Sequence, residues 1–119
     1  MPSAPQSLRE PPLPPPIYLI LLALQDGDSH GYRIRADVID RSSGTVSLDP
    51  GSLYRLIARL LDEGLISEAT ARAEPATGDR RRLYRLTAIG RRVLAAETDR
   101  MADLVAQARA RSPKRPRPA

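Results

Sequence analysis

The sequence predicts a mainly α-helical fold with a small β-hairpin and a long C-terminal helix. Between residues 48 and 66 the apolar residues recur at helical spacing, at Leu53, Leu56, Ile57 and Leu60. Residues 65–87 instead consist of two extended stretches on either side of a loop that contains Pro75 and Gly78. The chain has 119 residues, which suits one domain with a single small core.

Composition restricts the chemistry that the chain can perform. It has no Cys and a single His, His30, which excludes thiolate metal sites and multi-histidine metal centres. No second catalytic group accompanies His30, so a structural hydrogen bond explains this residue better than acid–base work does. No pair of carboxylates stands at a recognisable catalytic spacing. We therefore expect neither an enzyme nor a cofactor.

The net charge is +5, and the basic residues gather after residue 64. A polyanionic partner would therefore be held mainly by the second half of the chain. The one strongly apolar run, residues 17–24, is too short to cross a bilayer and follows prolines rather than a lysine-rich leader. Neither a membrane span nor a signal peptide is expected, and the expected location is the cytoplasm.

Prolines crowd residues 1–16, a density that favours an extended, disordered arm without helix or sheet. A role as an SH3-type ligand is an alternative, although such tracts more often serve as solvated tails. Residues 17–25 are apolar nearly all round, which predicts a short helix that is covered on more than one side.

A second helix is expected over residues 30–42, capped by Ser29 and with Ile34 and Val38 facing inward. Gly31 is unusual in its first turn, because glycine lowers helix stability. We interpret this glycine as a point where another backbone, or a phosphate of bound DNA, approaches closely.

The helix within residues 48–66 carries signals for its start and its end. Asp49 can accept hydrogen bonds from the free amides of the first turn, Pro50 suits the first helical position, and Gly64 suits a left-handed stop. Small, hydroxyl and arginine side chains lie opposite the apolar stripe and on its flanks: Gly51, Ser52, Tyr54, Arg55 and Arg59. Such a face can enter a DNA major groove, where arginine reads guanine edges. An ordinary amphipathic surface helix is the alternative.

Two neighbouring segments favour the DNA interpretation. Residues 45–48 form an extended link between two helices, which is the outline of a helix-turn-helix. The hairpin that follows has strands at residues 65–73 and 80–87, and it carries Arg80, Arg81 and Arg82 in succession. There they would meet the flanking DNA backbone or minor groove. A solvated run of charge is the alternative.

A final helix is expected from Ala88 to about Ala110, capped by Thr87. Along it, residues repeat at the 4-3-4-3 spacing of a coiled-coil seam, at Leu94, Thr98, Met101, Val105 and Ala108. No other free apolar surface is evident, so this helix is expected to pair with the same helix of a second copy. The alternative is that it folds back on its own domain.

Three separated motifs resemble those of the PadR-type transcriptional regulators. They are His30-Gly31-Tyr32, Leu48-Asp49-Pro50-Gly51-Ser52-Leu53-Tyr54 with Glu63-Gly64-Leu65-Ile66, and Gly78-Asp79-Arg80-Arg81-Arg82-Leu83-Tyr84-Arg85-Leu86-Thr87. The resemblance implies a winged helix-turn-helix whose third helix reads the major groove, a basic wing, and the C-terminal dimerisation helix of the short subfamily. It also implies repression that is released by a small-molecule effector or another signal.

The sequence departs from the family pattern at two points. Asp79 stands in the wing where proline is common, and this places a negative charge beside Arg80. The chain also lacks Trp, so the aromatic drug-stacking mode of some short members has no counterpart, and the effector is not identified.

The chain thus divides into a disordered Pro-rich arm (1–16), a winged helix-turn-helix domain (17–87), a dimerisation helix (88–111) and a disordered basic tail (112–119). We expect a homodimeric, sequence-specific repressor that binds double-stranded DNA at a pseudo-palindromic operator. The candidate DNA-binding residues are Tyr32, Arg33, Gly51, Ser52, Tyr54, Arg55, Arg59, Arg80, Arg81 and Arg82. The alternative is a winged-helix interaction module whose arginine wing docks an acidic protein partner without reading DNA.

Overall fold

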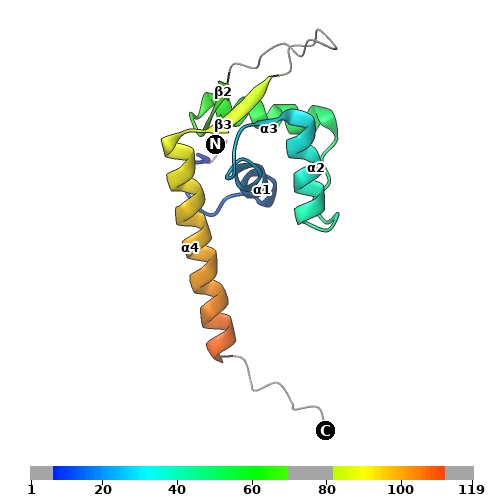
Figure 1. Ribbon diagram of the computed structural model, residues 1–119. Helices are drawn as coiled ribbons and strands as arrows, with labels where there is room; N and C mark the ends of the chain where they lie inside the picture. The colour runs from blue at the N-terminus through cyan, green and yellow to red at the C-terminus, as the bar shows by residue number, and fades with distance from the viewer. Residues whose placement is uncertain (1–6, 70–81, 112–119) are drawn as a thin grey trace, which may run out of the picture.

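The computed structural model describes residues 7–69 and 82–111 of the chain. Its elements in these ranges are α1 (Pro15–Ala23), β1 (Ser29–His30), α2 (Gly31–Arg41), α3 (Pro50–Asp62), β2 (Ile66–Ala69), β3 (Leu83–Leu86) and α4 (Ala88–Arg111). Figure 1 shows α1 between α2 and α4, with α3 and the sheet across one end of these helices. The mainly α-helical winged helix-turn-helix fold with a small hairpin is therefore confirmed.

The three strands form one antiparallel sheet in the order β1-β3-β2. Tyr84 and Leu86 of β3 lie on its buried face, as their alternation predicts. The sequence analysis misses β1, in which Ser29 pairs with Tyr84 on the second edge of β3. Ser29 is thus a buried strand residue, and the prediction that it caps α2 is wrong. A strand of two residues has no periodic pattern of its own and depends on its neighbour.

Helix α1 is covered on several sides, as its apolar character predicts. Its residues pack with those of α2 and α3 in one core that includes Ile17, Ile20, Leu21, Ile34, Val38, Leu53, Ile57 and Leu60. The helix begins at Pro15, two residues before the predicted start, because the missing N–H of proline has no helical partner in the first turn. Within the described residues no helix combines the length and the apolar character needed to span a bilayer.

Helix α3 starts and stops where the sequence predicts. The Asp49 carboxylate accepts a hydrogen bond from the Ser52 N–H at 2.7 Å, and this bond lowers the pKa of Asp49. Gly64 follows the helix with φ +76°, the left-handed conformation that glycine adopts without strain. The helix is therefore held at both ends by local signals.

The turn after α3 packs directly against the start of α4. The Thr87 hydroxyl donates to the Gly64 carbonyl at 2.6 Å and accepts from the Gly90 N–H at 3.0 Å, which confirms Thr87 as the cap of α4. A Cβ on Gly90 would lie 2.0 Å from the Leu65 carbonyl oxygen, so no larger residue fits here without a backbone shift. This contact fixes where α4 leaves the domain.

The prediction that residues 1–16 are unstructured is wrong for residues 7–16. Leu8 and Leu13 are only 2% and 7% exposed and belong to the core. Prolines exclude a regular ladder of hydrogen bonds, but they do not prevent the leucines between them from being buried, which is favourable. Residues 1–6, like residues 112–119 of the predicted tail, lie outside the described ranges.

Helix α4 divides into a half that packs on its own domain and a half that leaves it. Leu94 is only 3% exposed and lies in the core, so its assignment to the dimer seam is wrong. The Thr98 and Tyr18 hydroxyls are 2.8 Å apart, which ties this half of α4 to α1. Beyond Met101 every described residue is exposed, and Figure 1 shows this part of α4 extending away from the other elements. The alternative prediction, that the final helix folds back on its own domain, is therefore correct for the first half of α4.

Glu97 is an acidic side chain in the packed half of α4, with 2% exposure. Its carboxylate accepts hydrogen bonds from the Leu13 N–H at 2.6 Å and from the Arg100 guanidinium. The bond from Arg100 and that from the Leu13 N–H hold the pKa of Glu97 below its ordinary value of 4.5, against the effect of burial. The buried Glu97 carboxylate therefore joins α4 to the N-terminal segment.

We expect Glu97→Gln to lower the free energy of unfolding by about 1 to 2 kcal/mol at pH 7. A carboxyl group whose pKa is lower in the folded chain stabilises the fold above its unfolded pKa, and this stabilisation is lost as pH falls through the folded value. The difference between variant and wild type should therefore shrink between pH 5 and pH 3, about where an unfolded Glu titrates. Urea unfolding followed by circular dichroism at several pH values measures it.

Glu10→Gln is the control, because it removes an exposed carboxyl group from the same N-terminal segment. It should leave stability nearly unchanged over this pH range. If the loss of unfolding free energy in Glu97→Gln stayed the same from pH 7 to pH 3, the charged hydrogen bonds assigned to Glu97 would be contradicted.

Candidate nucleic-acid interface

The link between α2 and α3 sets the position of the exposed face of α3. It leaves α2 through a turn in which Ser43 and Gly44 have φ +51° and +79°, and the Ser42 hydroxyl accepts from the Val46 N–H at 3.0 Å. The Arg35 guanidinium of α2 donates to the Leu48 carbonyl, one residue before the cap of α3. Sequence reasoning misses this role of Arg35, because the pattern of residues 30–42 does not show which carbonyl the side chain meets.

The exposed face of α3 carries the predicted recognition residues near its N-terminal end. Gly51 and Arg55 are exposed and Ser52 is partly exposed. The Arg55 guanidinium donates to the Ser52 hydroxyl at 3.0 Å, so the two side chains lie together on the outer surface of the helix. This arrangement offers a guanidinium fork and a hydroxyl beside a residue without a side chain, a combination suited to base edges in a groove.

Tyr54 has a second role that the sequence does not reveal. Its side chain is 50% exposed, yet a Cβ on Gly31 of α2 would lie 2.7 Å from its hydroxyl oxygen. The close approach predicted at Gly31 is therefore confirmed, but its partner is the Tyr54 ring rather than a backbone or a phosphate. Gly31 and Tyr54 thus set the distance between α2 and α3 at the outer surface.

The start of α2 contributes Tyr32 and Arg33, which are both exposed. The Tyr32 ring stacks on His30 with centroids 5.6 Å apart and an angle of 8° between the planes. His30 Nδ1 is buried and has no hydrogen-bond partner among the described residues, so the structure supports packing rather than the predicted hydrogen bond for this atom. The stack thus supports a Tyr32 ring that is 57% exposed.

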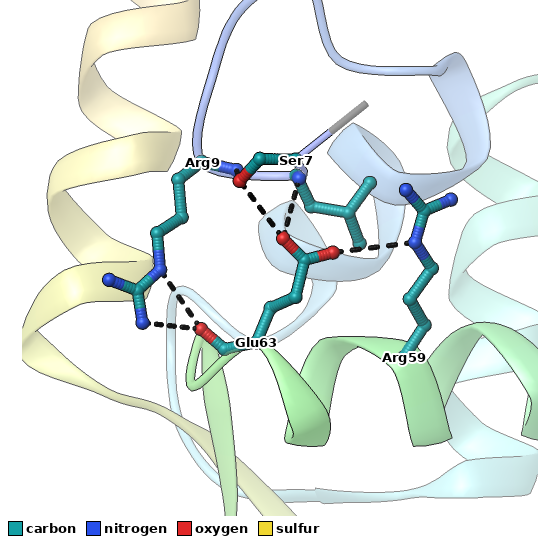
Figure 2. A network of polar contacts seen from close by, with 5 residues as sticks. Ser7, Arg9, Arg59 and Glu63 are labelled. Carbon is teal, nitrogen blue, oxygen red and sulfur yellow. Dashed lines mark hydrogen bonds and ion pairs between the residues drawn. The ribbon is translucent and has the colours of Figure 1, made fainter. Parts of the chain in front are cut away.

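Arg59 lies one turn after Arg55 and is turned toward the C-terminal end of α3. Its Nε is 3.3 Å from a carboxylate oxygen of Glu63. The other carboxylate oxygen of Glu63 accepts hydrogen bonds from Ser7 and Leu8, as Figure 2 shows for this cluster. Sequence reasoning misses Glu63 and Ser7, which are 56 residues apart in the chain. Arg59 therefore belongs to the candidate interface and to a structural network at once.

The wing begins in the hairpin strands β2 and β3. Arg82 precedes β3, its side chain is 77% exposed, and its Nε lies 3.5 Å from a carboxylate oxygen of Glu68 on β2. Such an exposed pair contributes little to stability, so the guanidinium can exchange this carboxylate for a phosphate at little cost. Arg80 and Arg81 lie outside the described residues, and their DNA contacts stay predictions.

Exposed side chains of this set thus lie on α2, on α3 and at the base of the wing. The set offers guanidinium, hydroxyl and backbone donors, which suit phosphates and base edges. Among the residues that the structure describes, no group of His, Cys, Asp and Glu has the arrangement of a metal site. The exposed guanidinium groups of Arg33, Arg55 and Arg82 suit an anionic partner.

Comparison with known proteins gives a family match over most of the folded chain. Residues 20–96 match the model of the transcriptional regulator PadR-like family. The chain is also 41% identical over 86 residues to an uncharacterised 37.1 kDa protein in a transposon of Streptomyces fradiae. That match covers 72% of this chain but 23% of the relative, so the chain spans about a quarter of the relative's length.

The fold is similar to solved structures of transcriptional regulators. A PadR family transcription regulator from Clostridium difficile has 25% identity and a TM-score of 0.67, and the match covers 80% of this chain and 95% of that one. Bacillus subtilis PadR in complex with operator DNA has 23% identity and a TM-score of 0.54, with coverage of 87% of this chain and 51% of that one. The second likeness concerns the fold alone.

Proposed function

The chain belongs to the PadR-like family of transcriptional regulators, and from this premise we propose that it is a homodimeric repressor of a pseudo-palindromic operator in double-stranded DNA. The domain whose core includes Leu8, Leu13 and Leu94 would bind DNA, and the distal part of α4, from Met101 onward, would dimerise. Release of the operator would follow a small-molecule effector or another signal. The observation that carries the proposal is the outer face of α3, where Arg55 and Ser52 are joined beside Gly51.

In this proposal the N-terminal half of α3 enters the major groove. Arg55 donates to guanine edges, while Ser52 and Tyr54 contact neighbouring bases or sugars. The absence of a side chain at exposed Gly51 allows the helix backbone to come close to the groove floor. Because a single helix face reads only a few base pairs, specificity at this site depends on a few side chains, of which Arg55 is the strongest donor.

The flanking residues would hold the DNA backbone. Tyr32 and Arg33 lie at the start of α2 and Arg82 at the base of the wing, on either side of α3 along the chain. Arg80, Arg81 and the edge residue Arg59 would add contacts to the backbone or minor groove. These contacts supply affinity for any sequence and leave the choice of sequence to α3.

Dimerisation through the second half of α4 would place two recognition helices on one face of the DNA. Leu104 and Val105 are large aliphatic side chains that are 49% and 47% exposed, on a part of α4 that no other described element covers. Together with Met101 and Ala108 they provide the apolar surface that a two-fold partner would cover. Two-fold symmetry implies an inverted repeat with half-sites about 34 to 36 Å apart.

Arg55→Ala tests the assignment of α3. It should lower the ratio of affinity for the operator over random DNA by about 5- to 100-fold, the loss of one specific base contact. Arg82→Ala is the matched comparison, since it should weaken binding to both DNAs alike and reduce the salt dependence by about one ion. The probe is an inverted repeat found in the DNA beside the protein's own gene. Binding of each variant to this probe is measured by titration at several salt concentrations.

Two results would count against the proposal. An unchanged specificity ratio in Arg55→Ala would remove α3 as the reading element. Failure of the wild type to retard any fragment from its own promoter at moderate salt would favour the alternative, a module that docks an acidic protein.

A further inference from the structure

Residues 7–13, which we call the strap, run across the domain from the end of α3 to the middle of α4. The strap precedes residues 20–96, the part of the chain that matches the family model. Leu8 and Leu13 near its two ends are buried in the core. The strap is therefore an ordered part of this fold that lies outside the residues matched by the family model.

The first attachment of the strap is Glu63, the C-cap residue directly after α3. One oxygen of its carboxylate accepts from the Ser7 hydroxyl at 3.0 Å and from the Leu8 N–H at 2.8 Å. The Arg9 guanidinium donates through two nitrogens to the Glu63 carbonyl, at 3.1 and 2.7 Å (Figure 2). A cation at this position also suits the negative end of the helix dipole. Four hydrogen bonds thus join the strap to the C-terminus of the recognition helix.

The second attachment is Glu97, about 10 Å along α4 from Gly90, at 1.5 Å per residue. The Leu13 N–H donates to its buried carboxylate at 2.6 Å. Burial of the two leucines is non-directional, but the hydrogen bonds at Glu63 and Glu97 fix the strap in position. The strap therefore connects the end of α3 to a defined point on α4.

Helix α4 packs on α1 through Leu94 and Thr98. It is also joined to the end of α3 at two places about 10 Å apart along α4, and together they fix the angle between the two helices. The first is the contact of Gly90 with the Leu65 carbonyl, just after α3. The second is the strap. Helix α4 has 24 residues and is about 36 Å long, so a rotation of about 5° at Gly90 moves its far end by about 3 Å. This displacement is close to the rise of one base pair, about 3.4 Å.

We propose that the strap sets the angle between α3 and α4, and with it the half-site spacing that the dimer accepts on DNA. The proposal rests on the proposed function. Ser7, Arg9, Glu63 and Glu97 act as positioning residues, since they orient the recognition helix without themselves contacting bases.

The test measures spacing selectivity, which is the preference of the dimer for one distance between half-sites over others. A segment that only stabilised the fold would not change this preference. The half-site that the wild type selects from random DNA is placed as an inverted repeat at its best spacing and at spacings one base pair shorter and longer. For the wild type we expect the affinity at the best spacing to exceed that at the other two spacings by about tenfold. For Ser7→Ala/Arg9→Ala we expect this ratio of affinities to be about two- to threefold. Glu97→Ala, which removes the acceptor of the Leu13 N–H at the other attachment, should have the same effect.

Breaking both attachments in one chain should do no more than breaking one, because the strap acts as a single connection. Arg92→Ala is the control for the lost charge: it removes one exposed cation from α4 and should weaken binding at all spacings alike. Circular dichroism and light scattering check that each variant is a folded dimer. If the double variant does not fold, Arg9→Ala alone, which keeps Ser7 and both leucines, provides the test.

The outcomes separate the two proposals. If the wild type selects no sequence from random DNA or is not a dimer, the proposed function fails. If it selects an operator and the folded strap variants discriminate among spacings as the wild type does, the role of the strap is overturned. Effects that add up in the combined variant would likewise reject a single connection between Glu63 and Glu97.

Discussion

Gly90→Ala is expected to destabilise the protein by about 3 kcal/mol or more. The added Cβ would lie 2.0 Å from the Leu65 carbonyl oxygen, and backbone rather than a movable side chain stands in its way. The same carbonyl accepts the Thr87 N–H at 3.1 Å, so moving it breaks a hydrogen bond at the cap of α4. Because small domains are stable by about 5 to 15 kcal/mol, this single methyl group removes a large share of the total.

Urea unfolding followed by circular dichroism measures this loss, and Gly51→Ala is its control. Gly51 is an exposed helical glycine whose added Cβ would lie 3.4 Å from the nearest atom, an ordinary contact. Alanine there should raise stability by about 0.5 to 1 kcal/mol through its higher helix propensity. Equal unfolding midpoints for Gly90→Ala and the wild type would mean that α4 does not approach the α3–β2 turn as closely as described.

Leu104→Glu/Val105→Glu is expected to convert the dimer to a folded monomer. The structure favours these two positions over Met101, because both are about half exposed whereas Met101 is partly buried. Four charges would then face one another across a two-fold interface. Since linking two half-site contacts raises apparent affinity by about 10² to 10⁴, operator affinity should fall by that factor.

Light scattering and operator titration measure the two effects. Ala106→Glu/Ala110→Glu is the matched control, because it adds the same charge to exposed positions on another face of the distal part of α4. The control should stay dimeric. A dimer that persists in Leu104→Glu/Val105→Glu would place the interface elsewhere on the chain.

Elements with local signals are predictable from the sequence. Helix α3 has its cap, its first proline and its stop within residues 49–64, and each acts on neighbouring backbone groups. Strand β3 alternates less and more buried residues, as its sequence pattern predicts, whereas β2 is buried at both Ile66 and Ala69 and does not alternate. Gly51, Ser52 and Arg55 are predictable as residues of the outer face of α3, since helical spacing places them away from Leu53.

Features that depend on distant partners are not predictable in this way. The strap is recognisable only through Glu63 and Glu97, whose contacts with it are 55 and 84 residues away in the chain. The spacing of Leu94 fits a coiled-coil seam. Whether Leu94 packs against a second copy or against its own domain depends on residues far away in the chain, which the spacing does not show. Gly31 signals a close approach, but the Tyr54 ring that makes it lies on another helix.

The strap also has a consequence for the order in which the protein is completed during synthesis. Ribosomes add about 5 to 20 residues per second, so Glu97 is made roughly 4 to 17 s after Leu13. Leu13 cannot reach its final hydrogen bond before that time, although it is among the first described residues to emerge. On a ribosome Leu13 would therefore find its hydrogen-bond partner later than residues 7–9 find Glu63, and α4 must be synthesised as far as Glu97 before the strap is attached at both ends.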